Sequence, residues 1–161
     1  MLEHSKFREI VMHTPLIAID LVVRNTTGQV LVGLRKNGPA KNTWFVPGGR
    51  ILKNEKISAA FQRITADELG AAIDRESARF LGVYEHLYEG NFADEPGFGT
   101  HYIVLAHEIR NFTASTFPVA QHSDYRWLSD RELLQTPDVH PYTRAYFVRR
   151  ECMSVLLVRK P

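Results

Sequence analysis

A carboxylate, Glu68, falls within the apolar stripe of a helix predicted at residues 56–69. At 100° per residue, Phe61, Ile64 and Glu68 share one face of that helix. An ionised carboxylate that faces protein costs several kcal/mol unless a cation or hydrogen-bond donors compensate it. The glycine pair at 48–49 leaves backbone amides and carbonyls uncovered, which suits a hard cation and a phosphate. The pattern therefore predicts a cation ligand, although a side chain so close to the helix end could instead reach solvent.

The residues around this helix also follow a known spacing. The segment resembles the Nudix box, a loop-helix-loop whose carboxylates bind magnesium against a nucleoside diphosphate linked to another group. The resemblance implies an α/β Nudix sandwich (α+β, α/β/α) with a mixed central sheet. The matching residues are Gly49, Glu55, Arg63, Asp67, Glu68 and Gly70.

The box departs from the family pattern at its centre. Ile64 stands where the family has Glu, Thr65 where it has an aliphatic residue, and Asp67 where it has Glu. Because position 64 lies one turn before Glu68 on the same face, this chain presents one carboxylate there instead of two. Fewer anionic oxygens hold fewer cations, so we expect one magnesium ion per active site, with manganese as a substitute. The change also argues against attack of water on phosphorus by the usual route.

A narrower resemblance covers most of the chain, from about Phe7 to Phe147. The segments are similar to the GDP-mannose mannosyl hydrolase branch of the family. That likeness implies magnesium-dependent hydrolysis of GDP-mannose, or a related GDP-hexose, to GDP and free sugar. Water would attack the anomeric carbon with inversion, and the enzyme would be a homodimer. The similar segments are HTPLIAID, GPAKNTWFVPGGR, QHSDYRWL and VHPYTRAYF.

Cleavage at the sugar leaves extra negative charge on the departing diphosphate, so cations are needed there. Arg35, Arg50 and Arg63 are the candidates, because a guanidinium can hold two phosphate oxygens at once. Each could instead form an ordinary exposed salt bridge. The metal ligands implied by the branch are the Gly48 carbonyl, Glu68 and Gln121.

Water also needs a base, and histidine has the most suitable pKa. His122 matches the branch's proposed base, although Gln121 and His122 could simply form a polar turn before a strand. Asp20 matches an acid near the sugar or metal and joins the catalytic candidates. A plain solvent-facing strand position is the alternative for Asp20.

Substrate-binding candidates come from three further segments. His86 and Tyr88 share one face of a predicted strand, and Tyr102 lies on the next strand. Phe7 matches an aromatic that stacks on guanine, on an N-terminal segment that could be exchanged between subunits. Each aromatic residue could instead be a core residue. Arg35 is expected to contact substrate as well.

The elements that position these residues can be predicted from local patterns. Strands outnumber helices without regular alternation, which favours a mixed sheet with helices on its faces. The helix in the box has Asn54 as a plausible cap and Gly70 as its stop, and PGGR at 47–50 is expected to form a tight turn. We expect strands at 16–23, 30–34, 44–46, 79–88, 100–109 and 124–128, and helices at 5–12, 56–69, from Ser129 and over 142–152.

Composition sets the outer limits. A chain of 161 residues with net charge +2 is expected to form one domain, residues 1–161, without a nucleic-acid or membrane partner. The single cysteine, Cys152, allows no internal disulfide and fits a reducing cytoplasm. Two other functions stay open: a pyrophosphohydrolase that cleaves nucleoside diphosphate sugars between the phosphates, and a nucleotide-sensing domain without catalysis.

Overall fold

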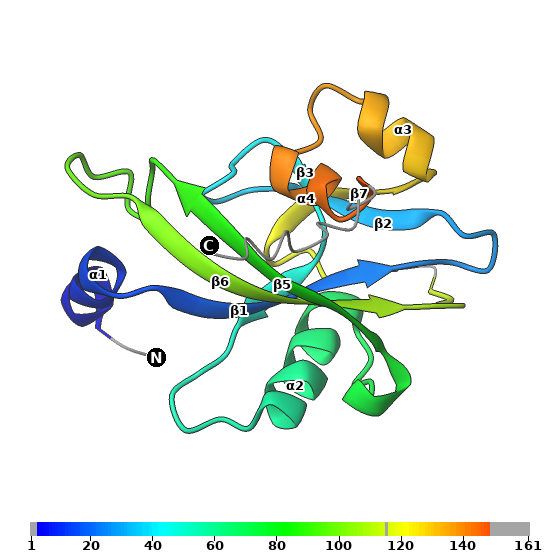
Figure 1. Ribbon diagram of the computed structural model, residues 1–161, viewed down its shortest axis with the longest axis horizontal. Helices are drawn as coiled ribbons and strands as arrows, with labels where there is room; N and C mark the ends of the chain where they lie inside the picture. The colour runs from blue at the N-terminus through cyan, green and yellow to red at the C-terminus, as the bar shows by residue number, and fades with distance from the viewer. Residues whose placement is uncertain (1–2, 115, 149–161) are drawn as a thin grey trace, which may run out of the picture.

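The computed structural model describes residues 3–114 and 116–148 (Figure 1). Its helices are α1 (His4–His13), α2 (Ile57–Leu69), the short 3-10 helix η1 (Arg75–Ser77), α3 (Asp130–Gln135) and α4 (Pro141–Ala145). Its strands are β1 (Leu16–Val23), β2 (Val30–Arg35), β3 (Trp44–Phe45), β4 (Gly48–Arg50), β5 (Arg79–Tyr88), β6 (Thr100–Ile109) and β7 (His122–Leu128).

The strands form two sheets. One is a mixed sheet of order β4-β1-β6-β5, in which β1 and β6 run parallel, and the other has the order β3-β2-β7. In Figure 1, α2 lies on one side of the strands, while α3 and α4 lie on the other. The predicted α/β class with a mixed sheet is confirmed, but the strands divide between two sheets instead of joining one.

Two apolar clusters hold these layers together. Phe61 and Ile64 of α2 pack against β1 residues such as Ile19 and Leu21 in the first cluster. The second joins Val30 and Val32 of β2 to residues of β3 and the C-terminal segment. The apolar stripe predicted for α2 is therefore confirmed as its packing face.

Several local predictions need correction. Asn54 does not cap α2: Lys56 occupies that position, and Asn54 adopts a left-handed turn conformation with φ of 65°. Residues 48–50 form strand β4 instead of a turn, because Gly48 fits tightly against β1, where a Cβ would lie 2.6 Å from the Ile19 carbonyl oxygen. Ser129 does open α3, with a complete capping box to Glu132.

The remaining differences concern the C-terminal third. Strand β7 begins at His122, two residues before its predicted start at Asp124. His122 is therefore part of the strand, and of the alternative polar turn at Gln121–His122 only Gln121 precedes the strand. The last helix, α4, covers Pro141–Ala145, and the part of the predicted helix at 149–152, including Cys152, lies outside the described residues. Among the described residues, no helix is long and apolar enough to cross a membrane.

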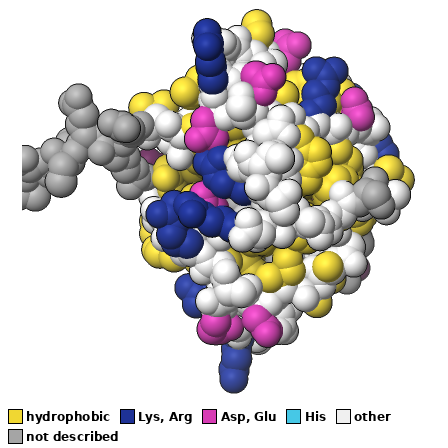
Figure 2. Space-filling model, turned by 90° about the vertical axis from the view of Figure 1, so that its right-hand side faces the viewer, with side chains coloured by type: hydrophobic (Ala, Val, Ile, Leu, Met, Phe, Trp, Pro, Cys, Tyr) yellow, Lys and Arg dark blue, Asp and Glu magenta, His cyan; other side chains and the backbone are white. Residues whose placement is uncertain are grey.

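A buried carboxylate, Glu108, ties the end of β6 to its neighbours. Its side chain is 3% exposed and forms ion pairs with Arg24 at 2.9 Å, Arg79 at 3.1 Å and Arg110 at 2.7 Å. Burial alone would raise the pKa of Glu108, but the hydrogen bonds from Arg110 and Arg24 outweigh it and hold the pKa below its usual value. Figure 2 shows how Lys and Arg side chains lie beside acidic ones on the face turned toward the viewer.

Replacing Glu108 with Gln should lower the free energy of unfolding at pH 7 by about 2–3 kcal/mol, because three guanidiniums lose their buried counter-charge. A carboxyl whose folded pKa is depressed stabilises the fold above its usual pKa and loses this effect as pH falls. The difference between Glu108→Gln and wild type should therefore shrink in urea denaturation toward pH 3. Asp130→Asn removes an exposed partner of Arg24 and is the control, with a cost of at most about 1 kcal/mol. Equal effects of both changes at pH 7 would contradict this assignment.

Candidate functional site

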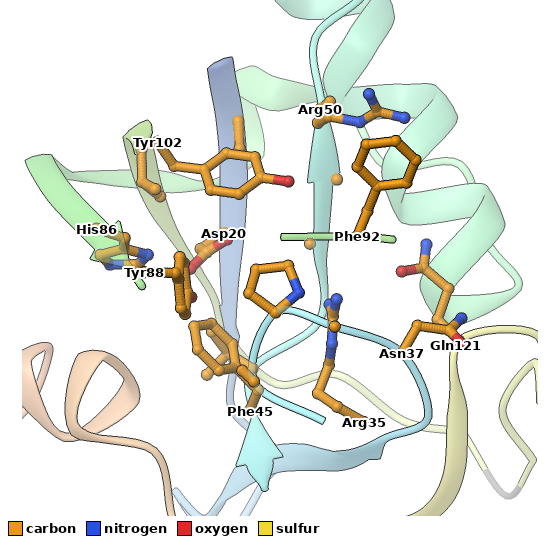
Figure 3. A pocket seen from close by; sticks show the side chains of 18 of the residues that line it. Asp20, Arg35, Asn37, Phe45, Arg50, His86, Tyr88, Phe92, Tyr102 and Gln121 are labelled. Carbon is orange, nitrogen blue, oxygen red and sulfur yellow. The ribbon is translucent and has the colours of Figure 1, made fainter. Parts of the chain in front are cut away.

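A cavity of about 520 Å³ opens beside β1, β4 and β6 (Figure 3). Nine of the twelve predicted site residues line it, and the other three, Arg63, Glu68 and His122, do not. The nine are Phe7, Asp20, Arg35, Gly48, Arg50, His86, Tyr88, Tyr102 and Gln121.

One end of the cavity carries an acid. Asp20 on β1 is 7% exposed and accepts a hydrogen bond of 2.6 Å from the hydroxyl of Tyr146. Burial raises the pKa of Asp20 to about 7, although Tyr146 and the nearby Arg35 partly oppose this. Asp20 is therefore a cavity residue and not the solvent-facing strand position considered above.

Aromatic rings form the wall at the same end. His86 on β5 lies opposite Tyr102 on β6 in the sheet register, and the Tyr88 ring lies edge-on to Tyr102 at 6.1 Å. Burial lowers the pKa of His86 to about 4, and His140 contributes in the same direction. At neutral pH His86 is therefore an uncharged ring. A carboxylate among such rings can accept hydrogen bonds from hydroxyls while the rings cover apolar surface.

The opposite end combines an aromatic pair with a cation. The Phe7 and Phe92 rings lie 4.6 Å apart, and the Arg50 guanidinium lies 4.1 Å from the centre of the Phe7 ring. Figure 3 shows Phe92 beside Arg50, across the cavity from His86 and Tyr88. Flat apolar faces with a cation suit a planar heterocycle. Phe7 lines the cavity of its own chain, and the exchange of N-terminal segments between subunits stays a prediction.

Arg35, at the end of β2, lies between the two ends. Its Nε is buried and has no hydrogen-bond partner among the described residues. A buried donor without a partner is costly, and its positive charge acts on both Asp20 and Glu68. This position suits an anionic ligand, and a guanidinium can bind two oxygens of a diphosphate.

Glu68 lies behind the cavity wall on α2 and is 3% exposed. The Gln121 amide donates to its Oε1 at 2.6 Å, and His122 Nδ1 lies 3.5 Å from its Oε2. Burial raises the pKa of Glu68 to about 7, with Arg35 opposing the rise. The alternative in which Glu68 reaches solvent from a frayed helix end is therefore wrong.

His122 is fully buried under Gly33, where an added Cβ would lie 2.4 Å from the imidazole. The Tyr125 hydroxyl donates its hydrogen to the Pro118 carbonyl at 2.7 Å, so at 3.2 Å it accepts from His122 Nδ1–H. Burial lowers the pKa of His122 to about 4, and Arg35 and Lys36 add to this. The neutral ring thus keeps a lone pair on Nε2, which has no partner among the described residues.

Arg63 has its guanidinium occupied within the box. It donates to both carboxylate oxygens of Glu55, at 2.7 and 2.9 Å, and to the Arg50 carbonyl at 2.9 Å. These contacts join α2 to the loop before it and to β4, which carries Arg50 into the cavity. In this arrangement Arg63 positions the box, and direct contact with a leaving group stays a prediction.

Comparison with known proteins supports the same family. Residues 14–150 match the model of the NUDIX domain. The chain belongs to the Nudix family. It is 35% identical over 145 residues to the low-salt glycan biosynthesis protein Agl8 of Haloferax volcanii, covering 88% of this chain and 86% of that protein.

Solved structures share the Nudix fold. A MutT NUDIX hydrolase from Burkholderia pseudomallei matches with a TM-score of 0.67 and 24% identity, over 84% of this chain and 97% of that one. The NUDIX domain of Shewanella oneidensis NrtR, complexed with ADP ribose, matches with a TM-score of 0.59 and 20% identity, over 90% of this chain and 96% of that one. Family and fold together support a hydrolase.

Nudix hydrolases generally use a divalent metal such as magnesium. Within residues 3–114 and 116–148, no group of three or more His, Cys, Asp or Glu side chains could hold a metal. The Glu68 carboxylate, the Gln121 amide oxygen and the Gly48 carbonyl stay the predicted ligands, and each offers a hard oxygen of the kind magnesium prefers. The desolvated Glu68, held only by neutral groups at hydrogen-bond distance, is a suitable place for a cation.

Phe92, Tyr142 and Tyr146 are site residues that the sequence analysis missed. Phe92 lies in the loop between β5 and β6, and the two tyrosines lie on or beside α4, far along the chain from the residues they contact. Phe92 is an aromatic residue in an otherwise polar loop, whereas the two tyrosines lie in VHPYTRAYF, a segment that the resemblance included without giving them a role.

Replacing Glu68 with Gln should stabilise the metal-free protein at pH 8 and abolish stabilisation by magnesium. Because burial raises the pKa of Glu68 in the folded state from 4.5 to about 7, ionisation of Glu68 lowers the free energy of unfolding as pH rises through this range. The cost is on the order of 1–3 kcal/mol, and the uncharged amide of the variant removes it. Thermal unfolding in EDTA and in excess magnesium measures both effects. Asp67→Asn, an exposed neighbour on the same helix, is the control and should keep the magnesium response. A Glu68→Gln protein that magnesium still stabilises would exclude Glu68 as the ligand.

Proposed function

We propose that the chain hydrolyses a GDP-hexose, such as GDP-mannose or GDP-glucose, to GDP and free sugar by attack of water at the anomeric carbon. The observation that carries the proposal is the buried Nε of Arg35, which has no partner in the part of the chain that the structure describes, between the two unlike ends of one cavity. A diphosphate on Arg35 would leave the base toward Phe7, Phe92 and Arg50, and the sugar toward Asp20 and His86. The relative Agl8 is named for glycan biosynthesis, which agrees with a nucleotide-sugar substrate.

The composition of the box favours cleavage at the sugar over cleavage between phosphates. Ile64, not a carboxylate, lies one turn before Glu68, and it packs against Gly49, where a Cβ would lie 3.1 Å from its Cγ1. An acid at position 64 would have to replace this buried contact. Glu68, Gln121 and the Gly48 carbonyl are therefore proposed to hold a single magnesium ion. When bound, that ion would neutralise charge on the departing diphosphate.

The chain's own residues supply the remaining chemistry. Arg35 and Arg50 orient the diphosphate and offset its growing charge. Asp20 accepts hydrogen bonds from sugar hydroxyls. His122 is assigned the base role: Tyr125 holds its Nδ1–H and leaves Nε2 to take a proton, from a ring whose pKa burial lowers to about 4. Because Nε2 is buried, this role requires the wall of the cavity to admit a water molecule to it.

The products of hydrolysis in water labelled with heavy oxygen test the reaction type. We expect GDP and labelled free hexose from GDP-mannose, because the attacked atom is carbon. Label in a phosphate product, with GMP and sugar phosphate, would instead establish the pyrophosphohydrolase. Binding without turnover under any divalent ion would establish the nucleotide-sensing domain.

Replacing His122 with Gln should reduce kcat for GDP-mannose by about 10²–10⁴ while leaving the affinity for GDP unchanged, because His122 does not line the cavity. Steady-state kinetics and calorimetric titration with GDP measure the two effects. Full activity would remove His122 from the base role and leave Asp20, a cavity residue with a pKa of about 7, as the candidate.

A further inference from the structure

The hydroxyl of Tyr146 contacts two residues of the cavity wall, Asp20 and His86. It is 2.6 Å from Asp20 Oδ2 and 3.3 Å from His86 Nε2. Asp20 and His86 line the cavity, whereas Tyr146 does not. Tyr146 follows directly after α4 as its C-terminal cap residue, so it brings the C-terminal segment to the sugar end of the site.

The hydrogen bonds at Tyr146 have one consistent direction. A tyrosine hydroxyl has a single hydrogen, and when Asp20 is ionised the shorter contact assigns that hydrogen to its Oδ2. At the longer contact, therefore, His86 Nε2–H donates to the Tyr146 oxygen. The chain of donors runs from His86 through Tyr146 to Asp20, and each bond polarises the next.

His86 and the ring of Tyr146 are each held in place by contacts from α4 and β5. The Tyr142 ring stacks on His86 at 4.2 Å with an angle of 6° between the planes. The Tyr142 hydroxyl also accepts from the Leu87 amide at 2.8 Å and donates to the Leu87 carbonyl at 2.6 Å. The ring of Tyr146 lies edge-on to Tyr84 at 4.7 Å. The position of the Tyr146 hydroxyl is thus fixed by contacts that do not involve Asp20.

Fixing Oδ2 of Asp20 determines where its other oxygen lies. Oδ1 is directed toward β4, where a Cβ on Gly48 would lie 2.7 Å away, and Gly48 is itself part of the cavity wall. Among the described residues, the hydrogen-bond donor to Asp20 is Tyr146, which donates to Oδ2. Oδ1 therefore has no donor from this part of the chain. A carboxylate with one oxygen held and the other open can accept a hydroxyl of a ligand in a defined direction.

We propose that Tyr146 is a positioning residue that holds Asp20 with Oδ1 toward the hexose, so that the C-terminal segment governs recognition of the sugar but not of the nucleotide. This inference rests on the proposed function, because it assigns the Asp20 end to the sugar.

Tyr146→Phe tests the inference, since it removes the hydroxyl and keeps the ring against Tyr84. We expect kcat/KM for GDP-mannose to fall about 10–100-fold, the effect of one hydrogen bond to a charged group, with an unchanged inhibition constant for GDP, which lacks the sugar. The thermal unfolding midpoint of the variant reports whether the fold is retained.

A double-mutant cycle with Asp20→Asn separates positioning from a purely structural role. If Tyr146 acts through Asp20, Tyr146→Phe should cause little further loss in the Asp20→Asn background. An equal loss in both backgrounds, or equal weakening of GDP and GDP-mannose, would overturn the inference while the proposed function stands. The proposed function fails if the wild-type protein hydrolyses neither GDP-mannose nor GDP-glucose and binds neither sugar nucleotide more tightly than it binds GDP. The assignment of Tyr146 to sugar recognition would then fail with it.

Discussion

The desolvated carboxylate of Glu68 is the constraint on which the site depends. It lies on the packing face of α2, so its charge is buried together with Phe61 and Ile64. The groups at hydrogen-bond distance are the neutral Gln121 amide and, at 3.5 Å, the neutral His122 ring. Only the charge of Arg35 opposes the raised pKa of this carboxylate, and we propose that a cation compensates the rest of its charge. An apolar Ile64 below it keeps the number of carboxylates at one.

The cavity beside Glu68 also carries charged side chains that are not paired with one another, along the path that the proposed substrate would occupy. Among the described residues, the buried Nε of Arg35 has no partner, and burial raises the pKa of Asp20, on which the charge of Arg35 also acts. A cation and an anion therefore both line the cavity. Such an arrangement is costly in the free protein, and under the proposed function a diphosphate and a sugar would offset that cost on binding. The aromatic pair Phe7 and Phe92 completes the other end, where apolar contact is sufficient.

Patterns within short stretches of sequence correctly predicted those helices and strands whose bounds depend on neighbouring residues in the chain. The bounds of β1, β5 and β6 were predicted as observed, because long apolar or alternating runs end at clear turn residues. The cap at Asn54 and the turn at 48–50 were wrong, because loop closure and the close approach of β4 to β1 decide them. The division of strands into two sheets depends on pairings across the whole chain, which periodicity does not specify.

The same distinction applies to the site. The resemblance identified residues that the cavity does bring together, from Phe7 near the start to Gln121. It did not predict that Arg63 would be occupied by Glu55, or that His122 would be fully buried against Gly33. Phe92 and Tyr146 were missed because each acquires its role only through contact with a residue far away in the sequence.

Counting bound manganese ions by electron paramagnetic resonance, with GDP present, tests the single-carboxylate site most directly. The structure predicts one ion per chain, lost when Glu68 is replaced by Gln. Two or more ions per chain, or one ion that persists without the Glu68 carboxylate, would contradict it.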